Sequence, residues 1–245
     1  MICVEHITKR YGKFTAVNDV SLIVNKGEVF AFLGPNGSGK TTTMKTIVGL
    51  NIPTEGRVLI NGIDIHKKPK EAKQFISYLP QRVVFSENLT AREVIRFYGS
   101  MRKLSKECAD KALADAHFNG FSDKAVSEFS GGMIQRLGLA VVSMPDAPIL
   151  LLDEPTANLD PHGVKRFREF VLEQKAKGKT IIFSTHLLAE VEQLADRVGI
   201  FVSGKLAALE SIENLQSTFL HTGSIEDLYL HYVGSYDNEK HERVF

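Results

Sequence analysis

One segment of this 245-residue sequence combines residue types and spacing that suit phosphate binding, and it reads Gly34-Pro35-Asn36-Gly37-Ser38-Gly39-Lys40-Thr41. Its glycines let several backbone N–H groups point at one anion, and a predicted helix starting near Lys40 adds its positive end. The Lys40 ammonium group suits the β and γ phosphates of a nucleotide, and the Thr41 hydroxyl suits Mg²⁺. The alternative is a glycine-rich turn that caps an ordinary helix. Because the four fixed positions would occur by chance in roughly one such chain in a hundred, the segment predicts a nucleotide site.

Two adjacent carboxylates follow an aliphatic run later in the chain. Asp153 and Glu154 come directly after Ile149 to Leu152, which predicts a strand ending at the edge of a sheet where ligands gather. Asp153 is suited to hold Mg²⁺, and an ionised Glu154 is suited to polarise a water molecule. Read alone, the pair also fits an ordinary helix start. The phosphate-binding segment upstream favours the catalytic interpretation.

A second sequence that could approach an anion is Ser130-Gly131-Gly132. Ser130 is a good helix N-cap, and the glycines allow a ligand close to the first amides of the helix that follows. By itself the motif is weak and fits a plain cap. Its position, between the phosphate-binding segment and the Asp-Glu pair, gives it weight.

The elements around these residues predict an α/β fold. Aliphatic runs at Ile149 to Leu152 and Thr180 to Ser184, separated by a helix from about Pro161 to Lys177, indicate a parallel sheet buried on both faces. The N-terminal quarter is predicted to be partly antiparallel. Asn25-Lys26-Gly27 predicts a hairpin between Val20 to Val24 and Val29 to Leu33, and Asn61-Gly62 predicts a second hairpin.

A helical insertion is predicted from about Ser86 to Met144. It begins with the capping box Thr90 to Glu93, after which Val94, Ile95, Tyr98 and Met101 recur at helical spacing. A second helix is predicted around Ala109, Ala112, Leu113 and Ala116.

Composition limits the function classes. The chain has 30 Lys+Arg against 29 Asp+Glu, and 43% of its residues are apolar, which is typical of one globular domain. The balanced charge gives no argument for nucleic-acid binding, so no nucleic-acid partner is expected. No apolar run is long enough for a membrane helix, the N-terminus has no secretory signal pattern, and the cytoplasm is the expected compartment. Cys3 and Cys108 are interpreted as packing residues.

Together these motifs resemble the ATP-binding subunit of ABC transporters over essentially the whole chain. The segment Gly34 to Thr41 is similar to the family's Walker A motif. Phe129-Ser130-Gly131-Gly132-Met133 resembles its signature motif, normally Leu-Ser-Gly-Gly-Gln, and Ile149 to Glu154 resembles Walker B with the catalytic glutamate. Tyr11, Gln81, Asp160 and His186 stand where the family has its adenine-stacking aromatic residue, Q-loop glutamine, D-loop aspartate and switch histidine.

The resemblance implies a P-loop NTPase with a RecA-like core, an N-terminal antiparallel β-subdomain and an α-helical insertion. It divides the single domain into a core with its β-subdomain (about 1–85 and 145–220), a helical subdomain with the signature motif (86–144), and a C-terminal helix and tail (221–245). The tail resembles that of exporter-like ABC-2 subunits.

The same resemblance implies Mg²⁺ and ATP, with ATP held head to tail between two subunits, a homodimer being expected. It also implies an integral membrane permease that this subunit powers from the inner face of the cell membrane. The implied catalytic residues are Glu154, His186, Gln81 and Lys40. The implied metal-site residues are Thr41, Gln81 and Asp153. The implied ATP-binding residues are Tyr11, Gly34, Pro35, Asn36, Gly37, Ser38, Gly39, Lys40, Thr41, Thr42, Ser130, Gly131, Gly132 and Asp160.

Two residues of the signature motif depart from the family pattern, and two alternative functions are less consistent with the sequence. Phe129 for Leu is expected only to repack, whereas Met133 for Gln removes an amide that could bond across the dimer. Because Ser130, Gly131 and Gly132 are retained, hydrolysis is expected to survive at an equal or lower rate. A soluble ABC-type mechanical protein is disfavoured because a chain of this length has room for neither a long coiled coil nor a second nucleotide domain. A GTPase or small-molecule kinase lacks support because no Asn-Lys-x-Asp motif is present.

Overall fold

The computed structural model describes residues 1–118, 120–157, 159–219 and 229. Its largest sheet has six strands in the order β10-β9-β3-β8-β7-β6. The five strands from β9 to β6 are parallel, and only β10 at the edge is antiparallel. The strands are β3 (Val29–Leu33), β6 (Ile76–Leu79), β7 (Ile149–Asp153), β8 (Thr180–Thr185), β9 (Arg197–Val202) and β10 (Lys205–Ser211). The parallel sheet predicted from the aliphatic runs is therefore confirmed.

Both faces of this sheet are covered, which explains why its central strands are apolar throughout. Every residue of β3 is buried, and alternate side chains enter different clusters. Phe30 and Phe32 pack toward the cluster shared with the four-stranded sheet, whereas Val29, Ala31 and Leu33 pack on the opposite face. Because strand side chains alternate between faces, a two-sided core requires such a continuous apolar run.

A second, four-stranded antiparallel sheet has the order β2-β1-β4-β5. Its strands are β1 (Ile2–Tyr11), β2 (Phe14–Val24), β4 (Glu55–Ile60) and β5 (Ile63–Asp64). The hairpin predicted at Asn61-Gly62 is confirmed: β4 and β5 pair across it, and both turn residues have positive φ, 49° and 80°.

The hairpin predicted at Asn25 to Gly27 is wrong. β2 belongs to the four-stranded sheet, whereas β3 pairs in parallel with β8 and β9. Burial is the physical reason, since β3 is buried on both faces and only the centre of the larger sheet offers two covered faces. Residues 25–27 instead cross from one sheet to the other, and the Gly27 N–H donates to the Thr180 hydroxyl at 2.9 Å.

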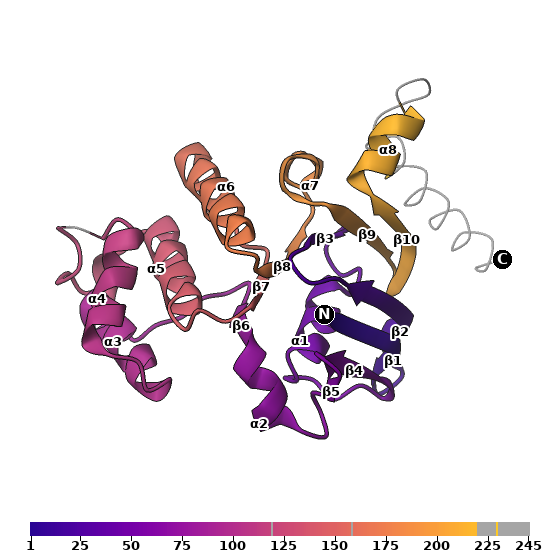
Figure 1. Cartoon of the computed structure of the whole chain (residues 1–245), viewed down its shortest axis with the longest axis horizontal. Helices are drawn as coiled ribbons and strands as arrows, with labels where there is room; N and C mark the ends of the chain where they lie inside the picture. Colours follow the sequence, from indigo (N-terminus) through magenta and orange to yellow (C-terminus); the bar gives the residue numbers. More distant parts are fainter. Residues whose placement is uncertain (119, 158, 220–228, 230–245) are drawn as a thin grey trace.

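The helices separate into two groups (Figure 1). The helices α3 (Ala91–Met101), α4 (Lys106–Asp115) and α5 (Gly131–Ser143) lie together at the end away from the four-stranded sheet and share a hydrophobic cluster of their own. The capping box at Thr90 and Glu93 is confirmed. Met101 does not join the buried face predicted for α3, because its side chain is 67% exposed.

The remaining helices accompany the sheets. They are α1 (Lys40–Ile47), α2 (Pro69–Ala72), α6 (Pro161–Ala176), α7 (Leu188–Leu194) and α8 (Ile212–Phe219), with short 3-10 turns at Lys73–Phe75 and Val126–Glu128. None of the helices in the described ranges has the length and apolar character needed to cross a membrane. The C-terminal helix predicted within 221–245 falls outside the described residues, apart from Tyr229.

Candidate active site

The phosphate-binding segment connects the carboxyl end of β3 to α1, as expected from its sequence. Gly39 has a φ of 104°, and a Cβ at this position would lie 2.8 Å from the carbonyl oxygen of Ala16. The close approach of β2 therefore requires glycine here. Asn36 and Gly37 are exposed at the tip of the loop, whereas Ser38 is buried and its hydroxyl has no hydrogen-bond partner in the described part of the chain.

Lys40 folds back over this loop. Its ammonium group donates to the carbonyl oxygens of Gly34 at 2.7 Å and Pro35 at 3.1 Å. The side chain is 4% exposed, and this burial lowers the pKa of Lys40, while the nearby charges of Glu154 and Asp153 oppose the shift. The segment thus holds one buried cation at the sheet edge.

Asp153 is the centre of an oxygen-rich cluster at the end of β7. Its Oδ1 accepts from the hydroxyls of Thr41 at 3.0 Å and Ser184 at 2.6 Å. Its Oδ2 accepts from the Tyr78 hydroxyl at 3.3 Å. Burial, followed by the charge of Asp153, raises the pKa of Tyr78 far above its ordinary value, so this hydroxyl remains a donor at neutral pH. Such a set of oxygen atoms, with the carboxylate fully buried, suits a hard divalent cation.

Glu154 brings three predicted site residues together. Gln81 Nε2 donates to Oε2 of Glu154 at 3.2 Å, His186 Nδ1 lies 3.9 Å from the same oxygen, and Lys40 Nζ lies 3.8 Å from Oε1. The backbone of Glu154 has a φ of 44°, which is uncommon for a residue other than glycine, and its N–H donates to Ser184 Oγ at 2.8 Å. The structure therefore holds Glu154 in one orientation at the meeting point of a cation, an amide and an imidazole.

Other predicted residues lie apart from this cluster. Among the described residues, no hydrogen bond or ion pair joins it to Tyr11, to Ser130, Gly131 and Gly132, or to Asp160. The Tyr11 ring is 49% exposed, with Lys9 Nζ 5.0 Å from its centroid, and its hydroxyl accepts from Asn51 at 3.0 Å. Ser130 caps α5 by accepting from the Met133 N–H, and Asp160 caps α6 by accepting from the Gly163 N–H.

The residues that depart from the family's signature pattern pack within the helical cluster. Phe129 and Phe118 have ring centroids 5.6 Å apart, and Met133 is half-buried against the same cluster. Thr42, the last predicted member of the phosphate-binding segment, is half-buried, and its carbonyl oxygen accepts from Thr46 Oγ1.

Three residues in or near the site were missed by sequence reasoning. Ser184 bridges Asp153 and Glu154, Tyr78 contacts Asp153, and Gln135 Nε2 of α5 donates to the Pro155 carbonyl oxygen at 2.9 Å. The available signal was that Ser184 follows the apolar run Ile181 to Phe183 and that Tyr78 lies near the end of the strand before Gln81. Neither residue type points to a phosphate site without the pairing of distant strands.

The parallel sheet, the glycine-rich loop between β3 and α1, and the Asp-Glu pair after β7 define a P-loop NTPase with a RecA-like core. A family model described as "ABC transporter" matches residues 17–157, which is more than half of the chain. The chain therefore belongs to the ABC transporter family, as an ATP-binding subunit that hydrolyses ATP. A second model, described as "AAA domain, putative AbiEii toxin, Type IV TA system", matches only residues 125–192.

Similar proteins agree with this membership. The linearmycin resistance ATP-binding protein LnrL of Bacillus subtilis is 37% identical over 221 residues, covering 89% of this chain and 71% of LnrL. The lantibiotic transport ATP-binding protein SrtF of Streptococcus pyogenes is 34% identical over 222 residues, covering 89% of this chain and 96% of SrtF.

Solved structures extend the similarity to the fold. An ATP-binding subunit of an ABC transporter superimposes with a TM-score of 0.86 at 30% identity, covering 95% of this chain and 99% of that one. A dimeric post-hydrolysis state of the ATP-binding cassette MJ0796 bound to ADP and phosphate has a TM-score of 0.79 at 25% identity, covering 86% and 99%.

Proposed function

We propose that this subunit hydrolyses Mg²⁺-ATP at the cluster around Glu154 and so powers a separate membrane permease. The single observation that supports this most strongly is the convergence of Lys40, Gln81 and His186 on Glu154, at 3.8, 3.2 and 3.9 Å. One buried carboxylate in contact with a cation, an amide and an imidazole suits the positioning of water beside a phosphate.

The residues are assigned separate roles. Glu154 orients and polarises the attacking water, and Gln81 and His186 fix that carboxylate. Lys40, released from the Gly34 and Pro35 carbonyls, neutralises phosphate charge together with the amides of residues 34–42. The adenine base stacks on the exposed face of Tyr11.

Thr41, Asp153 and Gln81 are proposed to hold the Mg²⁺ ion. The fit rests on the oxygen atoms of Thr41 and Asp153, 3.0 Å apart at the edge of the sheet, and on Gln81, whose Nε2 donates to the adjacent Glu154, so that its Oε1 is the atom that would bind the ion. When bound, the ion neutralises charge on the phosphate oxygens. Ser184 and Tyr78 fix the orientation of the Asp153 carboxylate.

A second copy of the chain is proposed to complete the site. Ser130, Gly131, Gly132 and Asp160 make no hydrogen bond to the Glu154 cluster within the described part of their own chain, and the amides at the start of α5 suit an anion. Head-to-tail pairing of two copies would bring these groups to the partner's phosphate-binding segment. A homodimer is supported by the dimeric state of the similar cassette MJ0796.

The permease is proposed to dock beside α3. Val84, Phe97 and Met101 are 67%, 54% and 67% exposed, and the ring contact of Phe85 with Tyr98 places the loop after Gln81 next to this helix. The subunit would then be peripheral on the inner face of the cell membrane. The names of SrtF and LnrL, a lantibiotic transport protein and a linearmycin resistance protein, support an exporter-like ABC-2 type system.

The division into a core with its β-subdomain (1–85 and 145–220), a helical subdomain (86–144) and a tail (221–245) is also a proposal. Its support is the separate hydrophobic cluster of α3, α4 and α5. Such a cluster would let the helical part move as one body.

The test is Glu154→Gln, which keeps the shape of the side chain and removes its charge. We expect ATP binding to persist, ATP turnover to fall by about 10² to 10⁴-fold, and a stable dimer to form with Mg²⁺-ATP on size-exclusion chromatography. Glu192→Gln is the matched control, because Glu192 is an exposed glutamate on α7. Unchanged turnover of a variant that stays monomeric with ATP would contradict the role of Glu154.

A further inference from the structure

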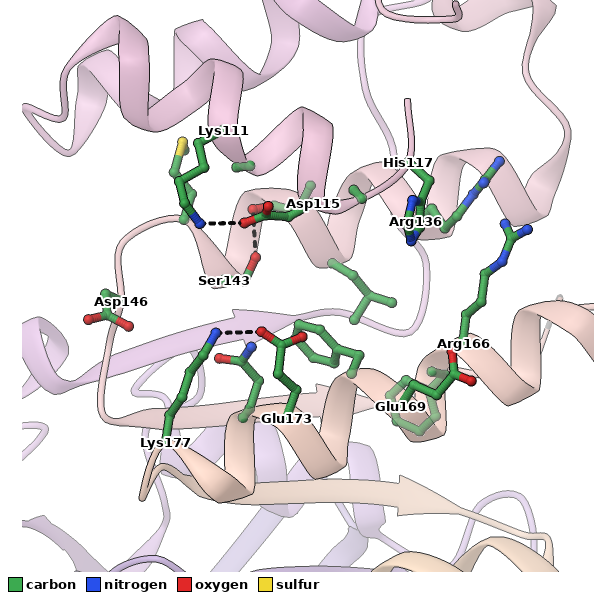
Figure 2. Close-up of a pocket in the computed structure, with 18 of the residues that line it drawn as sticks. Lys111, Asp115, His117, Arg136, Ser143, Asp146, Arg166, Glu169, Glu173 and Lys177 are labelled. Carbon is green, nitrogen blue, oxygen red and sulfur yellow. Dashed lines mark hydrogen bonds and ion pairs between the residues drawn. The ribbon is translucent and has the colours of Figure 1, made fainter. Parts of the chain in front are cut away.

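A cavity separate from the Glu154 cluster lies between α4, α5 and α6 (Figure 2). Its volume is about 560 Å³, within the range of small-molecule sites, roughly 300 to 1,000 Å³. Buried or half-buried apolar side chains line its interior, among them Leu139 and Met144 from α5 and its end and Phe167 and Phe170 from α6. This cavity could therefore enclose the apolar body of a small molecule.

The charged residues of the cavity are unevenly paired. Each of its four carboxylates has a lysine partner: Asp115 with Lys111 at 2.8 Å, Glu173 with Lys177 at 2.6 Å, Asp146 with Lys179 at 2.7 Å, and Glu169 with Lys165 at 4.0 Å. Two lining arginines remain, Arg136 on α5 and Arg166 on α6. Neither has an ion pair with a carboxylate in the described ranges of the chain, so the excess positive charge of the cavity is concentrated on them.

The two arginines lie at the same end. Figure 2 shows Arg136, Arg166 and His117 together, with Glu169 next to Arg166, and the Lys111–Asp115 and Lys177–Glu173 pairs at the opposite end. Arg136 is half-buried, and its guanidinium carbon lies 5.3 Å from the centroid of the Phe118 ring. Burial and then the like charge of Arg166 lower the pKa of Arg136, although Asp160 partly opposes this. An anion between the two guanidinium groups would relieve that repulsion.

We propose that this cavity binds a small amphiphilic anion, with its carboxylate, sulfonate or phosphate group between Arg136 and Arg166 and its apolar body along Leu139 and Phe167. Arginine pairs of this kind hold planar or tetrahedral oxyanions through several N–H donors. The apolar interior contributes affinity in proportion to the area that the ligand buries.

Occupancy would bridge two parts of the molecule. α5 packs with α3 and α4 through Leu137 and Ala140, and its Leu139 and Val142 join the sheet cluster to which Phe167 of α6 belongs, so the cavity lies where the two clusters meet. α5 starts at the Ser130 cap and α6 at the Asp160 cap, so a bound anion would fix the separation of two segments that we assign to the partner's nucleotide. This consequence, but not binding itself, rests on the proposed function.

The experiment is calorimetric titration of the nucleotide-free full chain with decanoate, below its micelle concentration, and with uncharged decanamide. We expect saturable binding of one decanoate per chain and at least tenfold weaker binding of decanamide. Arg136→Gln and Arg166→Gln should each weaken decanoate binding at least tenfold. Lys175→Gln is the matched control: it removes one positive charge from α6 at a residue that, like its ion-pair partner Asp196, does not line the cavity, and binding should be unchanged.

Two further measurements test whether the arginine variant stays folded and whether binding requires the volume of the cavity. Arg166 is exposed, so the Arg166→Gln variant is expected to keep the wild-type melting temperature and circular dichroism spectrum. Ser143→Leu fills the cavity without altering the arginines and should also abolish binding. Absence of saturable decanoate binding, equal binding of decanamide, or unchanged affinity in folded Arg166→Gln protein would each overturn the proposal. A parallel titration with an ATP analogue reports on the proposed function independently.

Discussion

Replacement of Ser184 by alanine is the sharpest test of how the site is held. Ser184 is fully buried in β8, one residue before the strand ends, and its hydroxyl donates to Asp153 Oδ1 at 2.6 Å and accepts from the Glu154 N–H at 2.8 Å. One small side chain thus links both carboxylate residues, and Glu154 depends on it to hold a backbone with a φ of 44°.

The expected loss follows from these two bonds. A hydrogen bond to a charged group contributes about 1.5 to 3 kcal/mol, and a buried N–H left without a partner costs about 1 to 3 kcal/mol. Alanine removes only one oxygen atom, so the cavity it leaves adds little destabilisation. The costs of the two lost hydrogen bonds are not fully additive, because the site relaxes around the change. We therefore expect Ser184→Ala to lower the free energy of unfolding by about 3 kcal/mol, a large part of the stability of a typical domain.

The stability assay is equilibrium unfolding in urea of the nucleotide-free protein, with the slope of the transition checked for agreement between variants. The functional assay is ATP turnover as a function of Mg²⁺ concentration. Loss of one bond to Asp153 should raise the Mg²⁺ concentration for half-maximal turnover, and loosening of Glu154 should lower the maximal rate.

Ser77→Ala is a matched control. Ser77 lies on β6, which flanks β7 on the side opposite β8; it is 2% exposed, and its hydroxyl has no partner among the described residues. Removing an unpaired buried hydroxyl should leave stability unchanged or raise it by about 1 kcal/mol. If Ser184→Ala costs no more than Ser77→Ala, or if its Mg²⁺ dependence equals that of the wild type, the bridging role assigned to Ser184 is refuted.

Two further predictions concern Lys40 and Asp110. Lys40→Ala should abolish measurable nucleotide binding, because it removes the buried cation of the phosphate-binding segment; titration with a fluorescent ATP analogue checks this, and wild-type affinity would disprove the assignment. Asp110 accepts from Arg96 at 2.8 Å, and hydrogen bonds from Arg96 hold its pKa below the ordinary value of an aspartate. This stabilisation is present above the ordinary pKa and is lost as the pH falls through the lowered one. Asp110→Asn should therefore reduce the melting temperature at neutral pH by more than in acid; thermal unfolding at both pH values checks this, and equal reductions would contradict it.

Local signals explain which parts of the fold could be predicted. The Asn61-Gly62 hairpin and the Thr90 capping box depend on residues within a few positions of each other, and both predictions are confirmed. The partner of β3 is a strand some 150 residues away, with Val29 opposite Ile181. No local pattern in Asn25 to Gly27 distinguishes a hairpin from a crossing between sheets, so that prediction failed.

The residues of the candidate site also fall into two groups, those predictable from one contiguous segment and those brought together by the order of the strands. The phosphate-binding segment is contiguous and carries its own chemistry in its sequence. Gln81, Glu154 and His186 each follow a strand end, and they meet because β6, β7 and β8 are neighbours in the sheet. Sequence reasoning predicted Glu154 from its position after an aliphatic run, and Gln81 and His186 through family resemblance. It missed Ser184 and Tyr78, because serine and tyrosine at strand ends are ordinary packing residues until the strand order is known.

Under the proposed function, the distribution of charge explains why one copy of this chain does not supply all the hydrogen-bond donors that the phosphate groups of ATP require. Lys40 donates to the Gly34 and Pro35 carbonyl oxygens and lies 3.8 Å from Glu154, so its ammonium group is engaged within its own chain. ATP must displace those carbonyls, and its own phosphate charge then requires further donors. The amides at the start of α5 are such donors, and in the described part of their own chain Ser130 caps the helix and makes no hydrogen bond to the Glu154 cluster. Two copies related by a twofold axis would each supply these donors to the other, so nucleotide binding and pairing would be linked.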